Sequence, residues 1–494
     1  MTFNSLSYFL FLPVVYLVFY FTADCWRWLV LLTASYGFYA TFKAPYLLAI
    51  LLMVTGISYT CGLCIAAQQD EAIRKRWLWI GIFVCVAILV LLKYLPFLES
   101  HTNRIFGLNN AISVTIIIIG VSYFTFQAIS YMADIYLEIE EPEHHFGRFA
   151  LYMAFFPKLL QGPIERAGDL LPQLKQPYQF NYDAMRSGML LFTWGLFKKV
   201  VVADRLALYA DQVYNHVHDY TGLSLIIGTY AYALQIYFDF SAYTDMARGT
   251  GRMFGINLTE NFNSPYLATS IADFWRRWHI SFSRWILDYI FKPLQLGWRN
   301  WGQAGTALAL IITFLVSGIW HGATWGFVVW GLLHGIYLAT STYYRPYQKL
   351  LHKWLRIDKS KWLKWWQVFV TFNLVCVAFI FFRAKTLNDA IYVVLHMFIG
   401  IYSYIQKMLV GIVGLEIANV RGLLRQLLID QPQSEFITLI FFLLVLCVTS
   451  QLKKRIYIYD TPIWYRWSAY YLLFIFISFF GTFNSITKFV YLQF

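Results

Sequence analysis

One histidine, His321, stands out as a residue that could carry chemistry, because it lies inside the apolar segment SGIWHGATWGFVVWGLLHG at positions 317–335. A histidine at membrane depth is costly as a cation and needs hydrogen-bond partners when neutral, so it is a functional candidate. Gly318 and Gly322 flank it and let another backbone or a ligand come close. A neutral imidazole there suits general-base catalysis toward a hydroxyl group. The alternative is a structural histidine that bonds to a neighbouring helix.

Two other histidines are weaker candidates. His279 lies in DFWRRWHISFSRWILDYIFKPL, positions 273–294, which we expect to form one amphipathic interfacial or half-buried helix. Its aromatic residues share one face, and His279 lies at the border of that face, where it can point inward. His334 follows His321 by 13 residues, which is about 220° around a continuous helix. We therefore do not expect His321 and His334 to share a face.

A carboxylate, Asp239, lies inside or at the end of an apolar run in QIYFDFSAYTDMARGTGRMFGINLTENFNSPY, positions 235–266. At that depth a carboxylate should be paired, and an arginine such as Arg276 is a possible partner. One interpretation is a buried ion pair that fixes the amphipathic helix. The other is direct contact with a reacting group.

Other catalytic signatures are missing from the sequence. It contains no H-E-x-x-H, G-x-S-x-G or P-loop motif, and no G-x-G-x-x-G opening a βα unit, which argues against a metalloprotease, a lipase-type hydrolase and a nucleotide-driven pump. Cys61 and Cys64 form a C-x-x-C, but no second pair or spaced histidines accompany it. We predict neither a metal site nor a disulfide framework.

The elements that position these residues are expected to be membrane-embedded helices. Of 494 residues 59% are hydrophobic and only 13% are charged, about half the share of a soluble globular protein. The net charge of +13 comes from short basic clusters between apolar runs, which indicates membrane orientation and not nucleic-acid binding. No polar interval is long enough to fold separately. We expect one membrane domain over 1–494, with N-terminal helices at 1–110, a catalytic core at 111–345 and C-terminal helices at 346–494.

Apolar runs of roughly 20 residues can cross a bilayer. The candidate spans are about 5–22, 26–42, 45–67, 77–97, 112–137, 186–209, 222–243, 303–320, 323–342, 366–382, 436–450 and 467–486. Several are short, which predicts tilted or incomplete crossings. In addition, Pro157, Gly162 and Pro163 interrupt the segment 155–174, which we expect to be a re-entrant element lining a wet cavity.

Basic loops set the expected orientation. Arg74–Arg76 and Arg345–Lys364 should be cytoplasmic, whereas Tyr209–Gly222 has no Lys or Arg and should face outward. Counting spans back from Arg74 places the N-terminus outside. Lys453–Arg455 is cytoplasmic only if residues 388–430 remain outside.

In the segments described above, the sequence resembles the membrane-bound O-acyltransferase (MBOAT) family, and within it the bacterial branch typified by alginate O-acetyltransferase. The resemblance covers most of the chain, and its paired W-R-R-W-H and W-H-G-A-x-W-x-F-x-x-W-G signatures are specific together. The other matching segments are SYFTFQAISYMADIYLE (122–138), GPIER (162–166), QIYFDFSAYTDMARG (235–249) and FRAKTLNDA (382–390). The resemblance implies an all-α polytopic membrane protein of about 11–12 tilted transmembrane helices, with re-entrant and interfacial helices in a ring around a thinned, tunnelled centre.

The resemblance implies that His321 is the catalytic histidine and His279 a second signature histidine near the cytoplasmic approach to the same tunnel. Whether His279 binds the donor or relays a proton stays open. Arg276 and Arg277 either attract coenzyme phosphates or face lipid head groups. The substrate-binding or supporting candidates are Asp239, Tyr243, Trp275, Arg276, Arg277, Trp320 and Glu165. Two departures put donor contacts in doubt: LQLGWRNWG replaces a common L-G-G-N-R, and Glu165 stands where the branch often has an apolar residue.

The implied activity is transfer of an acyl group, expected to be acetyl, from a cytoplasmic thioester such as acetyl-coenzyme A to a hydroxyl on the outer side. It would O-acetylate an extracytoplasmic polysaccharide from a bacterial cytoplasmic (inner) membrane, surrounded by membrane lipids. No permanently bound cofactor, metal or nucleic acid is expected. Because the outward loops are short and we expect no soluble outer domain, the family's usual partner, an extracytoplasmic SGNH-type hydrolase or acetyltransferase, is expected to complete the transfer to the polysaccharide acceptor.

Three alternatives remain. A transporter or flippase would also use intramembrane His and Asp, but it predicts an internal repeat, and we find none. A non-catalytic scaffold for polysaccharide export would not need a His-Gly pair in an apolar run. Within the enzyme interpretation, D-alanyl transfer to teichoic acid from a carrier-protein thioester is the runner-up. The polymer and the acyl group are not readable from the sequence.

Overall fold

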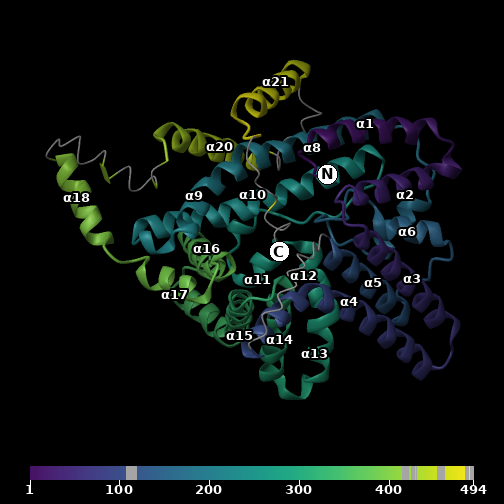
Figure 1. Ribbon diagram of the computed structural model, residues 1–494. Coiled ribbons are helices and arrows are strands. Elements are labelled where there is room, and N and C mark those ends of the chain that lie inside the picture. Colours follow the sequence, from purple (N-terminus) through teal and green to yellow (C-terminus); the bar gives the residue numbers. More distant parts are fainter. Residues whose placement is uncertain are drawn as a thin grey trace.

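The computed structural model describes residues 1–106, 120–413, 422–423, 429, 431–452, 462–483 and 489. In these residues every regular element is a helix and no strand occurs (Figure 1). The all-α polytopic architecture is therefore confirmed. The division of one domain near residues 110 and 345 stays a prediction.

The helices follow one another in three groups. The N-terminal group is α1 (Leu6–Phe21), α2 (Asp24–Ala40), α3 (Pro45–Ala67) and α4 (Glu71–Phe106). The central group is α5 (Val121–Tyr136), α6 (Phe146–Ala154), α7 (Ala167–Lys175), α8 (Tyr182–Phe197), the π-helix η1 (Lys198–Ala203), α9 (Asp204–Asn215), η2 (Val217–Asp219), α10 (Leu223–Met253), η3 (Pro265–Leu267), α11 (Ile271–Trp275), α12 (Ile280–Ile286), η4 (Leu287–Phe291), α13 (Lys292–Gly297), η5 (Arg299–Trp301), α14 (Gly302–His321) and α15 (Trp325–Trp354). The C-terminal group is α16 (Lys361–Arg383), α17 (Leu387–His396), α18 (Ile401–Val413), α20 (Gln433–Leu452) and α21 (Ile463–Phe480).

Most expected spans correspond to helices. Five segments of the described chain are long and apolar enough to cross a membrane, or six if the pair Leu387–His396 and Ile401–Val410, bent by 48°, forms one span. The five are Pro45–Ala67, Glu71–Tyr94, Arg299–His321, Lys361–Arg383 and Ile463–Phe480. α1 and Gln433–Leu446 are shorter apolar helices. A total of 11–12 crossings stays a prediction.

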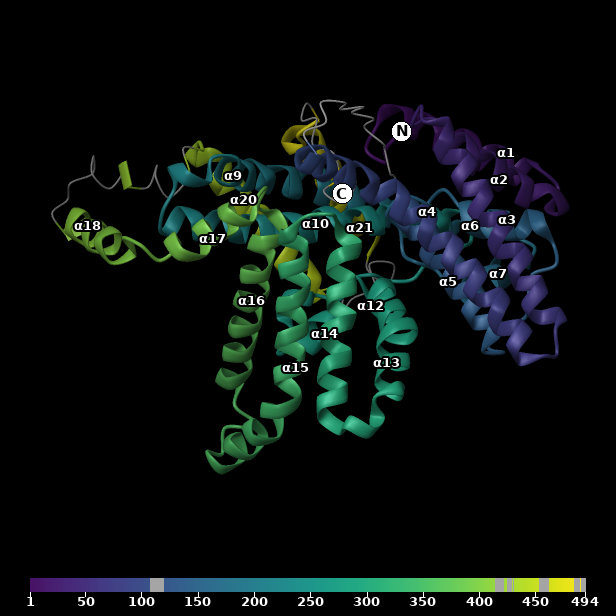
Figure 2. The same ribbon diagram turned by 60° about the horizontal axis from the view of Figure 1, so that its bottom comes forward.

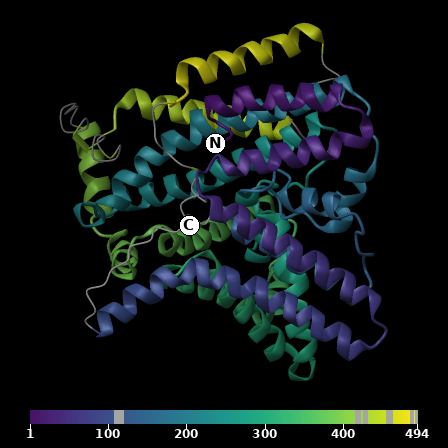
Figure 3. The ribbon, with the colours of Figure 1, turned by 45° about the vertical axis from the view of Figure 1, so that its right-hand side comes forward.

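The basic segment 345–364 lies at one end of a three-helix group. α14, α15 and α16 stand side by side and alternate in direction, and the turn between α15 and α16 falls within this segment (Figure 2). α3 and α4 form a second long pair, joined near Arg74 (Figure 3). Which side of the membrane these ends face stays a prediction. Lys453–Arg455, and residues 112–119 of one expected span, lie outside the described residues.

The prediction of one continuous helix over 273–294 is wrong, because the helix is broken. α11 ends at Trp275 and α12 begins at Ile280, with His279 between them at a φ of 43°. At the break, the Asn263 N–H donates to the Arg277 carbonyl and the Ile280 N–H donates to the Asn261 carbonyl, both at 3.0 Å. These bonds satisfy backbone groups that would otherwise be orphaned in a buried position. The buried aromatic face is nevertheless present, comprising Trp275, Trp278, Phe282 and Trp285.

The segment between α6 and α7 is irregular and enclosed by protein. Residues 155–166 form no regular helix, and every residue from Phe155 to Glu165 is buried. Irregular backbone at membrane depth is tolerated only where protein or an aqueous cavity surrounds it. The predicted interruption of the helix is confirmed. The wet cavity stays a prediction.

Glycines let α14 and α15 approach closely. A Cβ atom at Gly318 would lie against the Phe327 carbonyl oxygen and 3.2 Å from the Gly331 Cα, and one at Gly331 would meet the Phe314 carbonyl oxygen. Small residues at such crossings allow direct backbone packing in membrane proteins. The expected role of Gly318 is therefore confirmed, with α15 as the approaching backbone.

We predict that Gly331→Ala destabilises the fold, because the added methyl group has no space at this crossing. Overpacking of this kind costs about 1–3 kcal/mol. The measurement is the thermal unfolding temperature of the detergent-solubilised chain. The matched control is Gly56→Ala in α3, where a Cβ would meet no atom within 4 Å. Equal unfolding temperatures for the two variants would contradict the close crossing.

Candidate active site

His321 is positioned by the end of a helix. It is the last residue of α14, and the chain turns through residues 322–324 before α15 begins at Trp325. Because α14 and α15 pack as an antiparallel pair, residues near this turn face each other across the pair (Figure 2). The His321 side chain is thereby held inside the protein, with only 4% of the residue exposed.

Aromatic rings from three helices surround the His321 imidazole. Its ring centroid lies 4.5 Å from that of Trp320 on α14, 4.9 Å from that of Trp330 on α15 and 5.1 Å from that of Phe382 on α16. Rings at these separations are in van der Waals contact and leave little space for bulk water. The imidazole therefore lies in an apolar, enclosed setting.

His279 lies close to the same centre. It is 1% exposed, and its ring centroid is 4.8 Å from that of Phe240 and 5.1 Å from that of Phe282. The Phe282 ring is also 6.1 Å from the His321 ring. The two predicted histidines are therefore brought to the same aromatic ring, although 42 residues separate them in the sequence. The left-handed backbone at His279 is what directs it inward at the break between α11 and α12.

His334 belongs to this centre, contrary to expectation. The residue is fully buried, its ring lies 5.1 Å from that of Trp330, and its Nδ1 accepts a hydrogen bond of 3.3 Å from the Trp275 indole N–H. The expectation that His334 and His321 point apart assumed one continuous helix. The turn at residues 322–324 places them on facing helices instead, so both contact Trp330.

Asp239 forms a buried ion pair, but its partner is not Arg276. Its Oδ1 lies 2.6 Å from the Nζ of Lys199, which also pairs with Asp204 at 2.8 Å. Lys199 is held inward by η1 against α10, whereas Arg276 is exposed. The expected pairing with Arg276 is therefore wrong, and the structural interpretation of Asp239 is the one the geometry supports. In the sequence, this partner could have been suspected from the two consecutive lysines that follow an apolar run, Lys198 and Lys199.

The remaining candidates divide into two groups. Trp275 and Trp320 contact the histidine centre, through His334 and His321 respectively. The others are engaged in other contacts: the Tyr243 ring stacks on that of Phe3 at 4.7 Å, Arg277 pairs with Asp273 at 3.0 Å, and the Glu165 carboxylate accepts bonds from the N–H and hydroxyl of Thr259. Roles for these residues in substrate binding stay predictions.

Several residues of the centre were not singled out from the sequence. Trp330 and Phe382 lie within segments quoted for the family resemblance, and Tyr123 lies 6.3 Å from His279 between ring centroids. Lys93, a single cation in an otherwise apolar run, reaches the carbonyl of Trp320. The sequence could have indicated Lys93, because a charged residue at membrane depth is a functional candidate by default.

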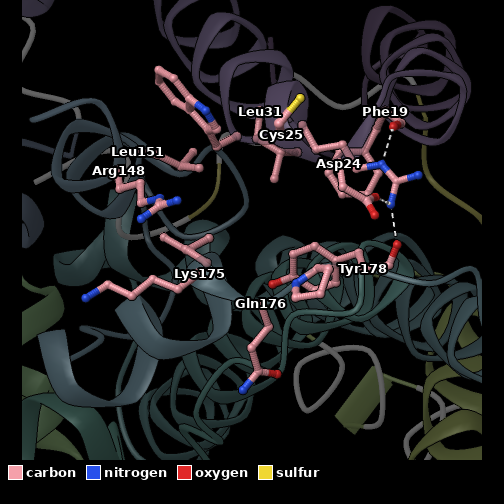
Figure 4. Close-up of a pocket in the computed structure, with 13 residues that line it drawn as sticks. Phe19, Asp24, Cys25, Leu31, Arg148, Leu151, Lys175, Gln176 and Tyr178 are labelled. Carbon is pink, nitrogen blue, oxygen red and sulfur yellow. Dashed lines mark hydrogen bonds and ion pairs between the residues drawn. The ribbon is translucent and has the colours of Figure 1, made fainter. Parts of the chain in front are cut away.

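Figure 4 shows a pocket that is separate from this centre. It has a volume of about 210 Å³, lies between the α1–α2 junction and α6–α7, and none of the predicted site residues line it. There the Arg27 Nε donates to the carbonyls of Phe19 and Thr22 at 3.0 Å, and the guanidinium also contacts Asp24 and the Tyr178 carbonyl. This arginine ties the loop at Tyr178 to the α1–α2 junction, which is a structural role.

The histidine centre is suited to proton transfer. Within the described ranges, no group of three or more His, Cys, Asp or Glu residues is arranged to hold a metal ion. What the geometry provides is a set of three buried imidazoles and an aromatic enclosure. An imidazole so placed can accept a proton from a hydroxyl group that enters the enclosure.

We predict that Asp239→Ala strongly destabilises the chain, because it leaves the buried Lys199 ammonium with one carboxylate instead of two. Removing one partner of a buried ion pair typically costs about 3–5 kcal/mol. The protein level in membranes and the thermal unfolding temperature measure the effect. Asp183→Ala is the control, since that carboxylate is 82% exposed and its ion pair is with Arg186, one helical turn away. If the two variants behave alike, the pair does not anchor α10.

Comparisons with known proteins agree with this architecture. Residues 65–381 match the family model of the membrane-bound O-acyltransferases. The chain is 36% identical to the peptidoglycan O-acetyltransferase of Helicobacter pylori over 390 residues, which cover 74% of this chain and 72% of the relative. It is 37% identical to the probable alginate O-acetylase AlgI of Pseudomonas aeruginosa, over 78% of this chain and 72% of the relative. The teichoic acid D-alanyltransferase of Bacillus subtilis is 26% identical, over 62% of this chain and 77% of that protein.

Proposed function

The chain belongs to the membrane-bound O-acyltransferase family, and from this premise we propose that it O-acetylates an extracytoplasmic polysaccharide, using a thioester donor on the cytoplasmic side. It is a multi-pass membrane protein and an O-acyltransferase. The proposal adds acetyl-coenzyme A as the donor, a bacterial inner membrane as the location, and an SGNH-type extracytoplasmic partner that passes the acetyl group to the polymer.

The observation that carries the proposal is the enclosed imidazole of His321 beside His279. In the proposed reaction His321 accepts the proton of the acceptor hydroxyl while the hydroxyl oxygen bonds to the thioester carbonyl carbon. The tetrahedral intermediate then collapses, the carbon–sulfur bond breaks, and the departing thiolate takes the proton from His321. A well-placed base contributes roughly 10²- to 10⁴-fold to such a step.

The aromatic rings have a definite part in this proposal. Trp320, Trp330 and Phe382 keep bulk water from the imidazole, so an acyl group there meets the acceptor hydroxyl in preference to water. A charged thioester donor cannot cross hydrocarbon by itself. A passage through the protein that ends at this enclosure would let donor and acceptor meet at membrane depth.

Acetyl transfer is favoured over D-alanyl transfer by the relatives. The proteins named O-acetyltransferase or O-acetylase are 35–38% identical to this chain, whereas those named teichoic acid D-alanyltransferase are 26% identical. The relatives' names include two different polymers, alginate and peptidoglycan. We therefore propose a polysaccharide hydroxyl as the acceptor class and leave the polymer to experiment.

We predict that His321→Ala abolishes O-acetylation of the host polysaccharide while the protein still accumulates in the membrane. The loss should be at least about 100-fold, because the general base is removed. The assay is acetate released from the isolated polymer by mild alkali. His144→Ala, at an exposed histidine, is the control and should behave as wild type. Acetate at the wild-type level in the His321 variant would refute the assignment.

For His279→Ala we predict a large but incomplete loss of O-acetylation, at least about 10-fold, because a group beside the reacting centre is removed without removing the base. The same acetate assay applies, with membrane protein level measured in parallel. Wild-type acetate content would show that His279 has only a structural part. Release of D-alanine instead of acetate from the wild-type polymer would favour the alternative activity.

A further inference from the structure

The helix α4 reaches the turn of α14 that carries His321. The Nζ of Lys93 donates a hydrogen bond to the carbonyl of Trp320, and the hydroxyl of Tyr94 donates to the carbonyl of Ile319. These carbonyls belong to the two residues that directly precede His321. Two side chains of α4 thus bind the backbone of α14 directly before His321.

The two carbonyls need such partners because α14 ends at His321. The last four carbonyls of an α-helix have no N–H donor within the helix. In the hydrocarbon core of a membrane no water is present to donate instead, so the protein must supply the donors. The C-terminal end of a helix also carries a partial negative charge, which an ammonium group complements. The bond from Lys93 is charge-assisted and stronger than a neutral hydrogen bond.

The charge of Lys93 is placed differently from the charges of the two lysines in η1. Lys198 and Lys199 each pair with aspartate carboxylates at 2.6–2.8 Å. In the part of the chain that the structure describes, no carboxylate forms an ion pair with Lys93. Its ammonium instead lies 5.7 Å from the centroid of the Trp320 ring. A lysine at membrane depth is rare and marks a candidate for a functional role.

We propose that Lys93 is a positioning residue for His321, fixing the last turn of α14 so that the imidazole stays at the reacting position. Tyr94 supports the same turn through the Ile319 carbonyl. This inference rests on the proposed function of His321 and adds a residue to which neither the family resemblance nor the relatives assign a role. It acts through the backbone of α14 and does not require contact with the substrate.

The test uses membrane vesicles from the host that carry the full chain together with the host's extracytoplasmic proteins, with radiolabelled acetyl-coenzyme A as the donor and the host glycan as the final acceptor. We expect Lys93→Met to lower kcat about 100-fold with little change in KM for the donor, because a misplacement of about 1 Å can cost that much. Lys93→Arg keeps a charged donor and should restore most of kcat. Lys75→Met, at an exposed position of the same helix, should match wild type.

Each outcome decides the matter. Wild-type kcat in Lys93→Met overturns the inference, as does a loss confined to the amount of folded protein. If Lys93→Met does not accumulate, Tyr94→Phe decides, with an expected loss in kcat of about 5-fold for one neutral hydrogen bond; unchanged kcat overturns the inference. If wild-type vesicles transfer no acetyl group, or His321→Ala transfers it equally well, the proposed function fails and the inference fails with it. Loss of transfer in His321→Ala but not in Lys93→Met removes the inference alone.

Discussion

Backbone groups and charges inside a membrane must find their partners within the protein, and the structure depends on this requirement more than on any other. Where α14 ends at His321, the carbonyls of Trp320 and Ile319 accept hydrogen bonds from Lys93 and Tyr94 of α4. The break at His279 persists because the backbone around Asn261 supplies the missing hydrogen bonds. Both signature histidines therefore lie where a helix stops, and in each case another segment makes that stop possible.

The buried aspartate–lysine pairs and the histidine centre are built from different groups. Buried lysines of η1 are neutralised by aspartates such as Asp239, which fastens α10 to its neighbours. The histidine centre, in contrast, is enclosed by aromatic rings. An imidazole enclosed in this way is suited to accepting a proton and releasing it within the same reaction.

The centre is assembled from parts of the chain that only the tertiary fold brings together. Trp320, Trp330 and Phe382 come from three helices that pack side by side, and Phe282 connects His321 with His279 (Figure 2). The region matched to the family extends over residues 65–381 and includes all of these except Phe382. The N-terminal residues also enter the core, because the Phe3 ring stacks on Tyr243 of α10. A single packed body thus holds the three histidines and the aromatic rings around them.

The sequence by itself determined the helical class, the membrane setting and most helix positions, and it singled out His321 and His279 as candidates, because apolar run length, glycine placement and a histidine at membrane depth are local properties of the chain. It could not determine that His334 joins His321, since that depends on a turn of three residues between two helices. Nor could it identify Lys199 as the partner of Asp239, or Lys93 as a contact of Trp320, 227 residues away. Those pairings depend on how helices cross and where they break, and the tertiary structure decided both because backbone groups freed at each break had to be satisfied by segments distant in the sequence.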